Sequence, residues 1–213
     1  LVGSEMCIRD RSKTARRLND DFEVSVGFIN GKRALGGMLE LMIHCHYLVA
    51  ANGTTLGMPE VTLPVVPGME GCHWPFRKSG ADNWPKLLHL LLSGRSIKAE
   101  EAAGWLIDFA GTLEESLKTV WSLAAGGDAG VARRKVEAGA LKGVPTEVAG
   151  LPPAGAPATE AARKAIMDTI QGSCAATLAD ALKIQTRHSA EFLTTPYCRK
   201  GRVGAEYART VVA

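Results

Sequence analysis

Residues 34–71 read ALGGMLELMIHCHYLVAANGTTLGMPEVTLPVVPGMEG, and this stretch decides the fold. Two adjacent glycines, Gly36 and Gly37, precede apolar residues at helical spacing, so we expect a helix over Met38–Cys45 with the glycines at its start. The apolar, β-branched run His46–Ala51 then predicts a strand. Helix and strand in such close succession indicate an α/β fold.

The start of this predicted helix has the features of a binding site for a developing negative charge. Glycine lets a ligand approach the backbone closely, and the N–H groups of a first helical turn have no intrahelical acceptor. Such groups suit a thioester carbonyl that becomes an enolate. Glu40 lies three residues beyond Gly37, about one turn deeper, and can face the same space. Without Glu40, Gly36 and Gly37 would indicate only close helix packing.

A second carboxylate, Glu60, lies on a segment that we expect to be extended, Leu56–Leu63. Pro59 fixes its own φ and keeps Met58 extended. Two carboxylates that converge on one cavity can divide acid and base roles if their environments separate their pKa values. Each alone has a plainer interpretation: an exposed helix carboxylate for Glu40 and a loop ion pair for Glu60.

The rest of the chain predicts one strand before this stretch, Phe22–Ile29, and helices after it. The predicted helices are Lys86–Leu92, Ala99–Gly104, Leu113–Ala125, Val131–Ala140, Ala161–Gln171 and Ser173–Thr194. Gly143–Thr159 contains four prolines and is expected to be a connecting loop.

Composition excludes several classes of protein. The net charge is +3 and the basic residues are scattered, which argues against a nucleic-acid partner. The five cysteines include no CxxC pair, so we expect reduced thiols in a cytoplasmic protein. The longest apolar stretch, 41–51, is interrupted by His44 and His46 and is too short to span a membrane. His44 and His46 lack an evident third ligand, so no metal is expected.

The first eleven residues, LVGSEMCIRDR, do not continue into the pattern that follows. They resemble translated sequencing-adapter read-through, and we expect them to be a non-native or disordered tail. The authentic reading would then begin near Ser12, with an upstream portion missing.

Taken together, the motifs of 34–71 resemble the enoyl-CoA hydratase/isomerase (crotonase) family without a gap. They are Ala-Leu-Gly-Gly followed by a helical Glu, a Cys before the strand, Gly-x-Pro-Glu-Val and Pro-Gly-x-x-Gly. Residues 90–102 are similar to the family's Leu-rich helix, Gly-Arg turn and Ala-Glu-Glu-Ala helix. Residues 162–201 resemble its C-terminal helices more loosely, so the resemblance covers most of 22–205.

The resemblance implies an α/β fold: a crotonase-like ββα spiral, its N-terminal part missing, followed by a helical C-terminal trimerisation region. Residues 12–110 would form the C-terminal part of the spiral core and 111–213 the helical region, with 1–11 as the tail. It also implies a homotrimer or hexamer and an acyl-CoA thioester as substrate. Coenzyme A would be part of that substrate, with no separate cofactor, no metal, no nucleic acid and no membrane.

For the site, the resemblance implies that Glu40 and Glu60 are the two catalytic glutamates and that Gly37 gives one oxyanion N–H. The implied substrate contacts are Gly36, Pro59, Leu63 and Gly68. Because both glutamates are present, the expected reaction adds water to the double bond of a 2-enoyl-CoA, or removes it.

Departures from the family pattern leave other functions open. The family's N-terminal part, which carries the second oxyanion N–H, is expected to be missing. His46 stands where the family has Asp, while Glu70 and His73 add a carboxylate and an imidazole near the expected acyl pocket. The chain is therefore alternatively an isomerase, or a lyase or hydrolase of another acyl-CoA in which Glu70 or His73 takes part. A third alternative is a catalytically incompetent fragment that acts only in oligomerisation.

Overall fold

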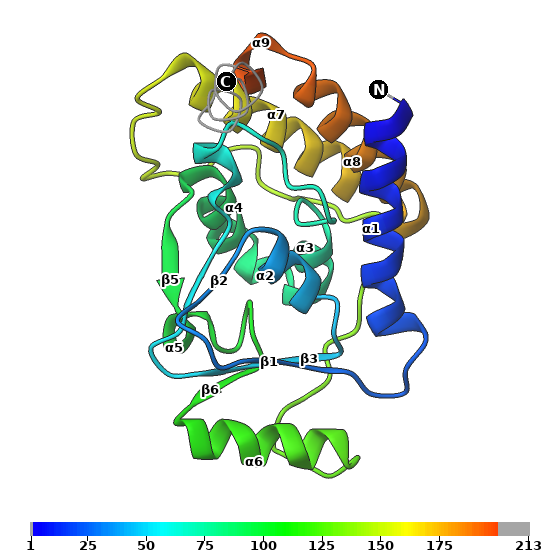
Figure 1. Cartoon of the computed structure of the whole chain (residues 1–213), viewed down its shortest axis with the longest axis vertical. Coiled ribbons are helices and arrows are strands. Elements are labelled where there is room, and N and C mark those ends of the chain that lie inside the picture. Colours follow the sequence, from blue (N-terminus) through cyan, green and yellow to red (C-terminus); the bar gives the residue numbers. More distant parts are fainter. Residues whose placement is uncertain (1, 200–213) are drawn as a thin grey trace, which may run out of the picture.

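Six short strands form two three-stranded sheets in the computed structural model, which describes residues 2–199 (Figure 1). The first sheet has the order β1 (Val26–Ile29), β3 (Tyr47–Ala51), β6 (Phe109–Gly111), all parallel. The second has the order β2 (Arg33–Leu35), β4 (Thr55–Gly57), β5 (Ser96–Lys98), with β5 antiparallel to β4. From β1 to β4, successive strands alternate between the sheets, which is the winding of a ββα spiral.

Helices surround the sheets on several sides (Figure 1). They are α1 (Val2–Asp20), α2 (Gly37–Met42), α3 (Trp74–Ser79), α4 (Trp84–Ser93), α5 (Ala99–Ala102), α6 (Leu113–Ala124), α7 (Pro157–Cys174), α8 (Leu178–Leu193) and α9 (Pro196–Arg199). Two short 3-10 helices are η1 (Pro59–Thr62) and η2 (Ala81–Asn83). α6 packs against the first sheet, α7 packs against α8, and α1 lies against α8.

The strand β3 shows why the core lies where it does. It is the central strand of an all-parallel sheet, and Leu48, Val49 and Ala50 are fully buried in succession. A parallel strand covered on both faces reads as a continuous apolar run rather than an alternating one. The strand predicted at His46–Ala51 is confirmed. The predicted helix at Met38–Cys45 is also confirmed, but α2 ends at Met42.

The helix α6 begins with a capping box at Thr112. The Thr112 hydroxyl accepts a hydrogen bond from the Glu115 N–H at 3.3 Å, and the Glu115 carboxylate accepts one from the Thr112 N–H at 2.8 Å. We expect Thr112→Ala to lower the free energy of unfolding by about 1 kcal/mol, because it leaves a first-turn donor without its cap. Urea denaturation measures the change, and Thr112→Ser, which keeps the hydroxyl, should restore most of it.

The prediction that Leu56–Leu63 is extended is wrong from Pro59 onward. Glu60 lies on the 3-10 helix η1, which begins at Pro59. The Glu60 carbonyl accepts hydrogen bonds from the N–H groups of Leu63 at 3.0 Å and Val65 at 3.1 Å. Proline suits a first helical position because its missing N–H would have had no partner there. The turn buries the Glu60 side chain.

The helix predicted at Val131–Ala140 is also wrong, because this segment has no regular secondary structure. Its polar groups bond to distant parts of the chain instead. The Glu137 N–H donates to the Arg77 carbonyl at 3.0 Å, and the Arg134 guanidinium donates to Asp108 at 2.7 Å. Tertiary contacts have thus overridden local helix propensity.

Two further boundaries differ from the sequence prediction. The helix expected at Ser173–Thr194 is two elements, because α7 continues to Cys174 and Thr177 caps α8. The expected absence of regular structure in residues 1–11 is not found for residues 2–11, which lie in α1 with Ile8 buried. Whether that stretch is native stays a prediction. The predicted helical region 111–213 extends beyond the described part, since residues 200–213 lie outside it.

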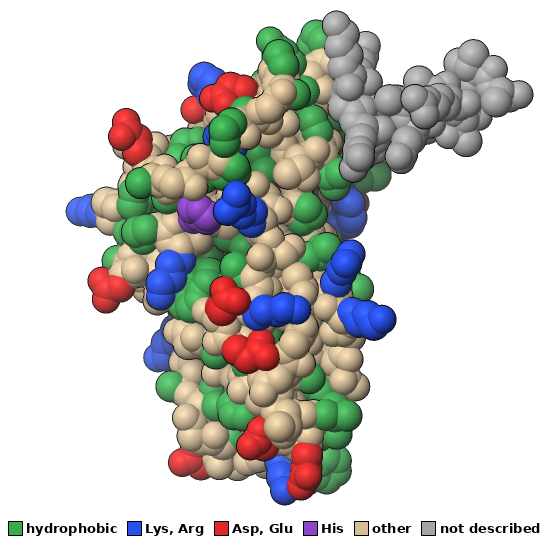
Figure 2. Space-filling view, turned by 90° about the vertical axis from the view of Figure 1, so that its left-hand side faces the viewer, with side chains coloured by type: hydrophobic (Ala, Val, Ile, Leu, Met, Phe, Trp, Pro, Cys, Tyr) green, Lys and Arg blue, Asp and Glu red, His purple; other side chains and the backbone are tan. Residues whose placement is uncertain are grey.

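Charge is dispersed over the face shown in Figure 2, where basic and acidic side chains are interspersed rather than gathered into one patch. Within residues 2–199, no helix combines the length and apolar character that crossing a bilayer requires.

Candidate active site

Four of the predicted site residues line one cavity of about 260 Å³: Gly37, Glu40, Glu60 and Gly68. The other lining residues are Ile8, Arg11, Val65, Val66, Met69, Ser189 and Leu193. The cavity therefore lies where α2, η1 and the loop after η1 meet α1 and α8. The structure brings together the two carboxylates and the first residue of α2, as the sequence predicts.

Glu40 is buried, with 2% of its surface exposed, and its carboxylate is held by backbone donors. Its Oε1 accepts hydrogen bonds from the N–H groups of Met69 and Gly71, both at 2.8 Å. Burial raises the pKa of Glu40, while these two N–H groups and the nearby His44 oppose that rise. Glu40 is thus the carboxylate whose charged form the backbone stabilises.

Glu60 has a different environment, although it lines the same cavity. It is 7% exposed, and its Oε2 has no hydrogen-bond partner among the described residues. Burial raises the pKa of Glu60 to about 8, and the neighbouring charge of Glu40 adds to that rise. At neutral pH, Glu60 therefore holds its proton.

The two glycines at the start of α2 have distinct roles. Gly36 has φ of 54°, and a Cβ there would lie 2.8 Å from Glu60 Oε1, so both its conformation and its neighbour require glycine. Its N–H donates to the Gly57 carbonyl at 2.9 Å. Gly37 is the first residue of α2, and its N–H has no intrahelical acceptor. Gly37, rather than Gly36, is therefore the available backbone donor at the cavity.

The remaining predicted substrate contacts lie beside the cavity rather than in its lining. Pro59 begins η1 and its Cδ would lie 3.8 Å from a Cβ on Gly36. Leu63 follows the last residue of η1 and is half-buried. Pro59, Leu63 and Gly36 thus position Glu60 and α2, while Gly68 lines the cavity.

Comparison with known proteins gives a partial sequence match and a match of fold. No family model matches the chain. It is 45% identical over 69 residues to the human "Peroxisomal bifunctional enzyme", covering 32% of this chain and 9% of that protein. It is 41% identical over 69 residues to a "Probable enoyl-CoA hydratase" of Rhizobium meliloti (strain 1021), covering 32% of this chain and 26% of that protein. The chain thus spans about a quarter or less of these curated relatives.

The fold extends the likeness over nearly the whole chain. A carnitinyl-CoA dehydratase from Mycobacterium thermoresistibile matches with a TM-score of 0.64 at 19% identity, covering 95% of this chain and 66% of that chain. The chain is similar to enoyl-CoA hydratases over 69 residues of sequence, and its fold is that of the crotonases. Its two sheets, α2 and C-terminal helices are the crotonase fold.

Several residues that line the candidate site were missed from the sequence. Ile8 and Arg11 come from α1, and Ser189 and Leu193 come from α8. No local motif marks them, because they reach the cavity only through tertiary packing. Conversely, the suggested part of Glu70 in the acyl pocket is not found, since Glu70 lies outside the cavity lining.

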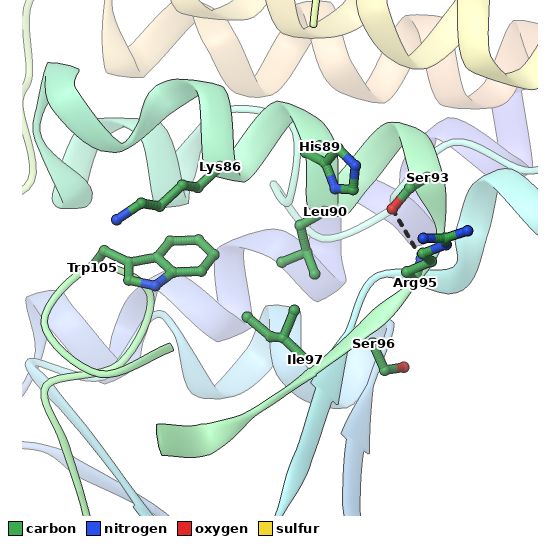
Figure 3. Close-up of a pocket in the computed structure, with 8 residues that line it drawn as sticks. All are labelled: Lys86, His89, Leu90, Ser93, Arg95, Ser96, Ile97 and Trp105. Carbon is green, nitrogen blue, oxygen red and sulfur yellow. Dashed lines mark hydrogen bonds between the residues drawn. The ribbon is translucent and has the colours of Figure 1, made fainter. Parts of the chain in front are cut away.

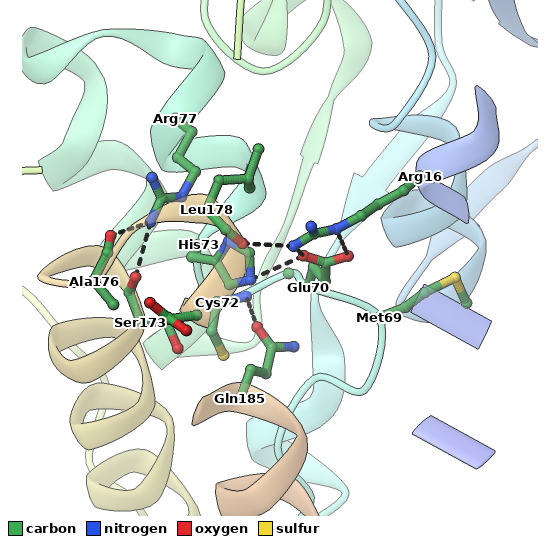
Figure 4. A network of polar contacts seen from close by, with 12 residues as sticks. Arg16, Met69, Glu70, Cys72, His73, Arg77, Ser173, Ala176, Leu178 and Gln185 are labelled. Carbon is green, nitrogen blue, oxygen red and sulfur yellow. Dashed lines mark hydrogen bonds and ion pairs between the residues drawn. The ribbon is translucent and has the colours of Figure 1, made fainter. Parts of the chain in front are cut away.

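His73, the other candidate for the acyl pocket, likewise lies outside the cavity lining, in a buried network with Glu70 (Figure 4).

A second cavity, of about 290 Å³, lies between α4 and β5 of the crotonase fold (Figure 3). Its lining residues are Lys86, His89, Leu90, Ser93, Arg95, Ser96, Ile97 and Trp105. It contains no carboxylate, so the candidate acid–base pair is Glu40 and Glu60 in the first cavity. Among the described residues, no group of three or more His, Cys, Asp or Glu is arranged to hold a metal ion.

Proposed function

We propose that this chain carries the acid–base centre of an acyl-CoA hydratase, which adds water to the double bond of a 2-enoyl-CoA thioester or removes it. The observation that carries the proposal is the shared cavity of Glu40, Glu60 and Gly37. The partial identity to enoyl-CoA hydratases over 69 residues supports the same reaction class.

The different environments of the two carboxylates divide their roles. The Glu40 carboxylate, stabilised by two N–H donors, takes a proton from water as the water oxygen bonds to the β-carbon. Glu60, whose pKa is about 8, delivers its proton to the α-carbon. The product has gained one OH and one H, and one proton then returns from Glu40 to Glu60 to complete the cycle.

The Gly37 N–H is suited to the thioester oxygen, which becomes negatively charged as the enolate forms. It opens α2, so the partial positive charge of that helix start acts in the same direction. A preorganised donor of this kind stabilises the charge that develops in the transition state more than the charge of the ground state.

The direct test is hydration of crotonyl-CoA by the 213-residue chain, followed through the loss of enoyl-thioester absorbance, with binding of a non-reactive acyl-CoA measured by calorimetry. Hydration supports the proposal. Turnover of a 3-enoyl-CoA without hydration would instead show a crotonase-type isomerase, and turnover of another acyl-CoA a lyase or hydrolase. A chain that binds no CoA ester and only self-associates would overturn the enzymatic proposal in favour of an oligomerisation fragment.

We propose further that the chain assembles as a homotrimer or hexamer in the cytoplasm. Exposed apolar side chains on α6 support self-association: Leu113, Leu117 and Trp121 recur at helical spacing and are 47%, 48% and 79% exposed. Light scattering of the purified chain gives the mass directly, and a monomer at micromolar concentration would contradict the assembly.

Gly71→Ala is expected to lower the kcat of this reaction by about a hundredfold, as for a catalytic group displaced by about 1 Å. A Cβ at this position would lie 2.8 Å from Glu40 Oε1 and 3.1 Å from Pro67 Cβ, so the carboxylate must move. Steady-state kinetics on crotonyl-CoA measures the loss. Gly31→Ala is the matched control, because its Cβ would meet only a carbonyl oxygen at 4.0 Å. Equal losses in the two variants would contradict the explanation.

A further inference from the structure

Glu70 is a fully buried carboxylate that takes no part in the proposed chemistry and lies outside the cavity lining. Figure 4 shows it with Arg16 and His73. Its side chain has 0% exposure, and the guanidinium of Arg16 from α1 binds it with two hydrogen bonds. Arg16 Nε donates to Glu70 Oε1 at 2.8 Å, and Arg16 Nη2 donates to Oε2 at 2.6 Å. A paired geometry of this kind fixes direction as well as distance.

Two imidazoles complete the surroundings of Glu70. His73 Nε2 lies 3.1 Å from Glu70 Oε2, and His44 Nε2 lies 3.6 Å from Oε1. Burial opposes ionisation of Glu70, but the contacts with His44, His73 and Arg16 outweigh it and hold the pKa of Glu70 well below its usual range. Glu70 is therefore a buried anion that Arg16 holds with two hydrogen bonds and that two imidazoles flank.

The backbone of Glu70 is as constrained as its side chain. Its φ is 70°, in the left-handed region that favours glycine and that other residues adopt only where their surroundings impose it. The residues on either side, Met69 and Gly71, are the two whose N–H groups both reach Glu40 Oε1. The unusual turn at Glu70 is thus the turn that aims two donors at one catalytic oxygen.

The same cluster also contacts the backbone of Glu40. His44 Nδ1 lies 2.7 Å from the Glu40 carbonyl oxygen, and because a carbonyl only accepts, Nδ1 carries the proton. The opposite ring nitrogen of His44 faces Glu70. Glu70 is therefore linked to Glu40 through the loop on one side and through α2 on the other.

We propose that Glu70 is a positioning residue for Glu40. Its buried contacts hold the strained turn that keeps the Met69 and Gly71 N–H groups on the Glu40 carboxylate. This role rests on the acyl-CoA chemistry proposed above for its catalytic meaning, but the geometric claim is independent of the substrate. Arg16 fixes the turn from α1, and also donates to the Leu178 carbonyl at the start of α8 at 2.9 Å.

The direction of the effect on Glu40 separates positioning from simple electrostatics. If Glu70 acted only through space, removing its negative charge would make Glu40 easier to ionise and lower its pKa. If Glu70 holds the turn, its loss releases two N–H donors from the Glu40 carboxylate, and the pKa of Glu40 rises. The two mechanisms therefore predict shifts of opposite sign.

The experiment is a titration of the Glu40 carboxyl by ¹³C NMR in the full chain, with the resonance assigned through Glu40→Gln. In Glu70→Gln we expect the pKa of Glu40 to rise by about one to two units, which is what loss of backbone donors to a carboxylate entails. The kcat at neutral pH is expected to fall, because less Glu40 is ionised, while KM stays unchanged.

A charge-conserving variant covers the case in which Glu70→Gln does not fold. Arg16→Lys keeps the positive charge but loses the planar fork, so a rise of the Glu40 pKa in this variant comes from geometry alone. The matched control is Asp108→Asn, which removes the carboxylate of the ion pair with Arg134. That pair is comparably buried, with side chains 2% and 18% exposed against 0% and 17% for Glu70 and Arg16. Asp108→Asn should leave the Glu40 pKa unchanged.

A Glu40 pKa that falls or stays constant in Glu70→Gln overturns the proposal, and so does an equal rise in Asp108→Asn. If Glu70→Gln does not fold, the outcome in Arg16→Lys decides in the same way. The NMR arm needs no substrate. A chain without acyl-CoA activity but with the expected pKa rise would therefore refute the proposed function and leave the positioning role standing.

Discussion

Glu60→Gln lowers kcat for hydration of a 2-enoyl-CoA by about 10²- to 10⁴-fold, and Glu40→Gln does the same, because each removes one partner of the proton transfer. The amide of Gln keeps the volume of the side chain but neither holds nor accepts the required proton. In Glu60→Gln the α-carbon receives no proton from the enzyme, whereas in Glu40→Gln the attacking water keeps its proton.

Steady-state kinetics with crotonyl-CoA measures both losses, and KM should change little because neither carboxylate is assigned to binding. Glu114→Gln is the control, since its carboxylate lies on α6 with its side chain 78% exposed. The double variant is expected to be scarcely worse than either single one, because groups that act as a unit are not additive. Near-normal kcat in either single variant would contradict the assigned roles.

The second large effect of Glu60→Gln is on stability. Although the substitution lowers kcat, we expect it to raise the free energy of unfolding above that of the parent at alkaline pH. The pKa of Glu60 rises from 4.5 to about 8 on folding, mainly because the carboxyl is buried. Below pH 4.5, both states hold the proton, so Glu60 makes no pH-dependent contribution to stability. As pH rises towards 8, the unfolded chain releases the proton first, so the free energy of unfolding falls.

At about 1.4 kcal/mol per pKa unit, this fall amounts to at most about 4 kcal/mol between pH 4.5 and pH 8, and it ends above pH 8. The amide introduced by Glu60→Gln has no proton to release in this range, so the loss is absent from the variant. Other groups also titrate; Lys78 is buried and its pKa is lowered to about 8. The difference between parent and variant cancels their contribution. Urea denaturation at about pH 5 and about pH 8.5 measures it, and parallel pH dependences would contradict the buried state of Glu60.

The convergence of Glu40 and Glu60 on one cavity was predictable because its determinants are local. Gly37, Glu40 and Glu60 lie within one stretch, and a glycine before a helix carries its own physical meaning. The prediction that Glu60 lies on an extended segment was wrong for an equally local reason. A proline suits both an extended segment and the first position of a short helix. Hydrogen bonds from Leu63 and Val65 to the Glu60 carbonyl, which sequence does not reveal, decide between them.

The rest of the site depends on contacts between residues distant in the sequence. Arg16 and Glu70 are 54 positions apart, and Arg16 and Leu178 are 162 apart. Neither pair has a periodic or motif signal. The helix predicted at Val131–Ala140 failed in the same way, because bonds from Arg134 and Glu137 to distant groups hold the segment in an irregular path.

The turn at Glu70 has a consequence for how such a protein can diverge. Met69 faces the cavity and Glu70 faces the buried network. The first position is therefore constrained by the ligand and the second by the packing of the interior. The Met69 side chain can change with the ligand of the proposed site while its N–H still donates to Glu40. The effects of substitutions at Glu70, Arg16 and His73 depend on one another. Replacing one of them leaves its partners buried without the contact that compensates their burial. Under the proposed function, a change of substrate preference therefore needs only single substitutions at Met69, whereas Glu70, Arg16 and His73 need to be replaced together.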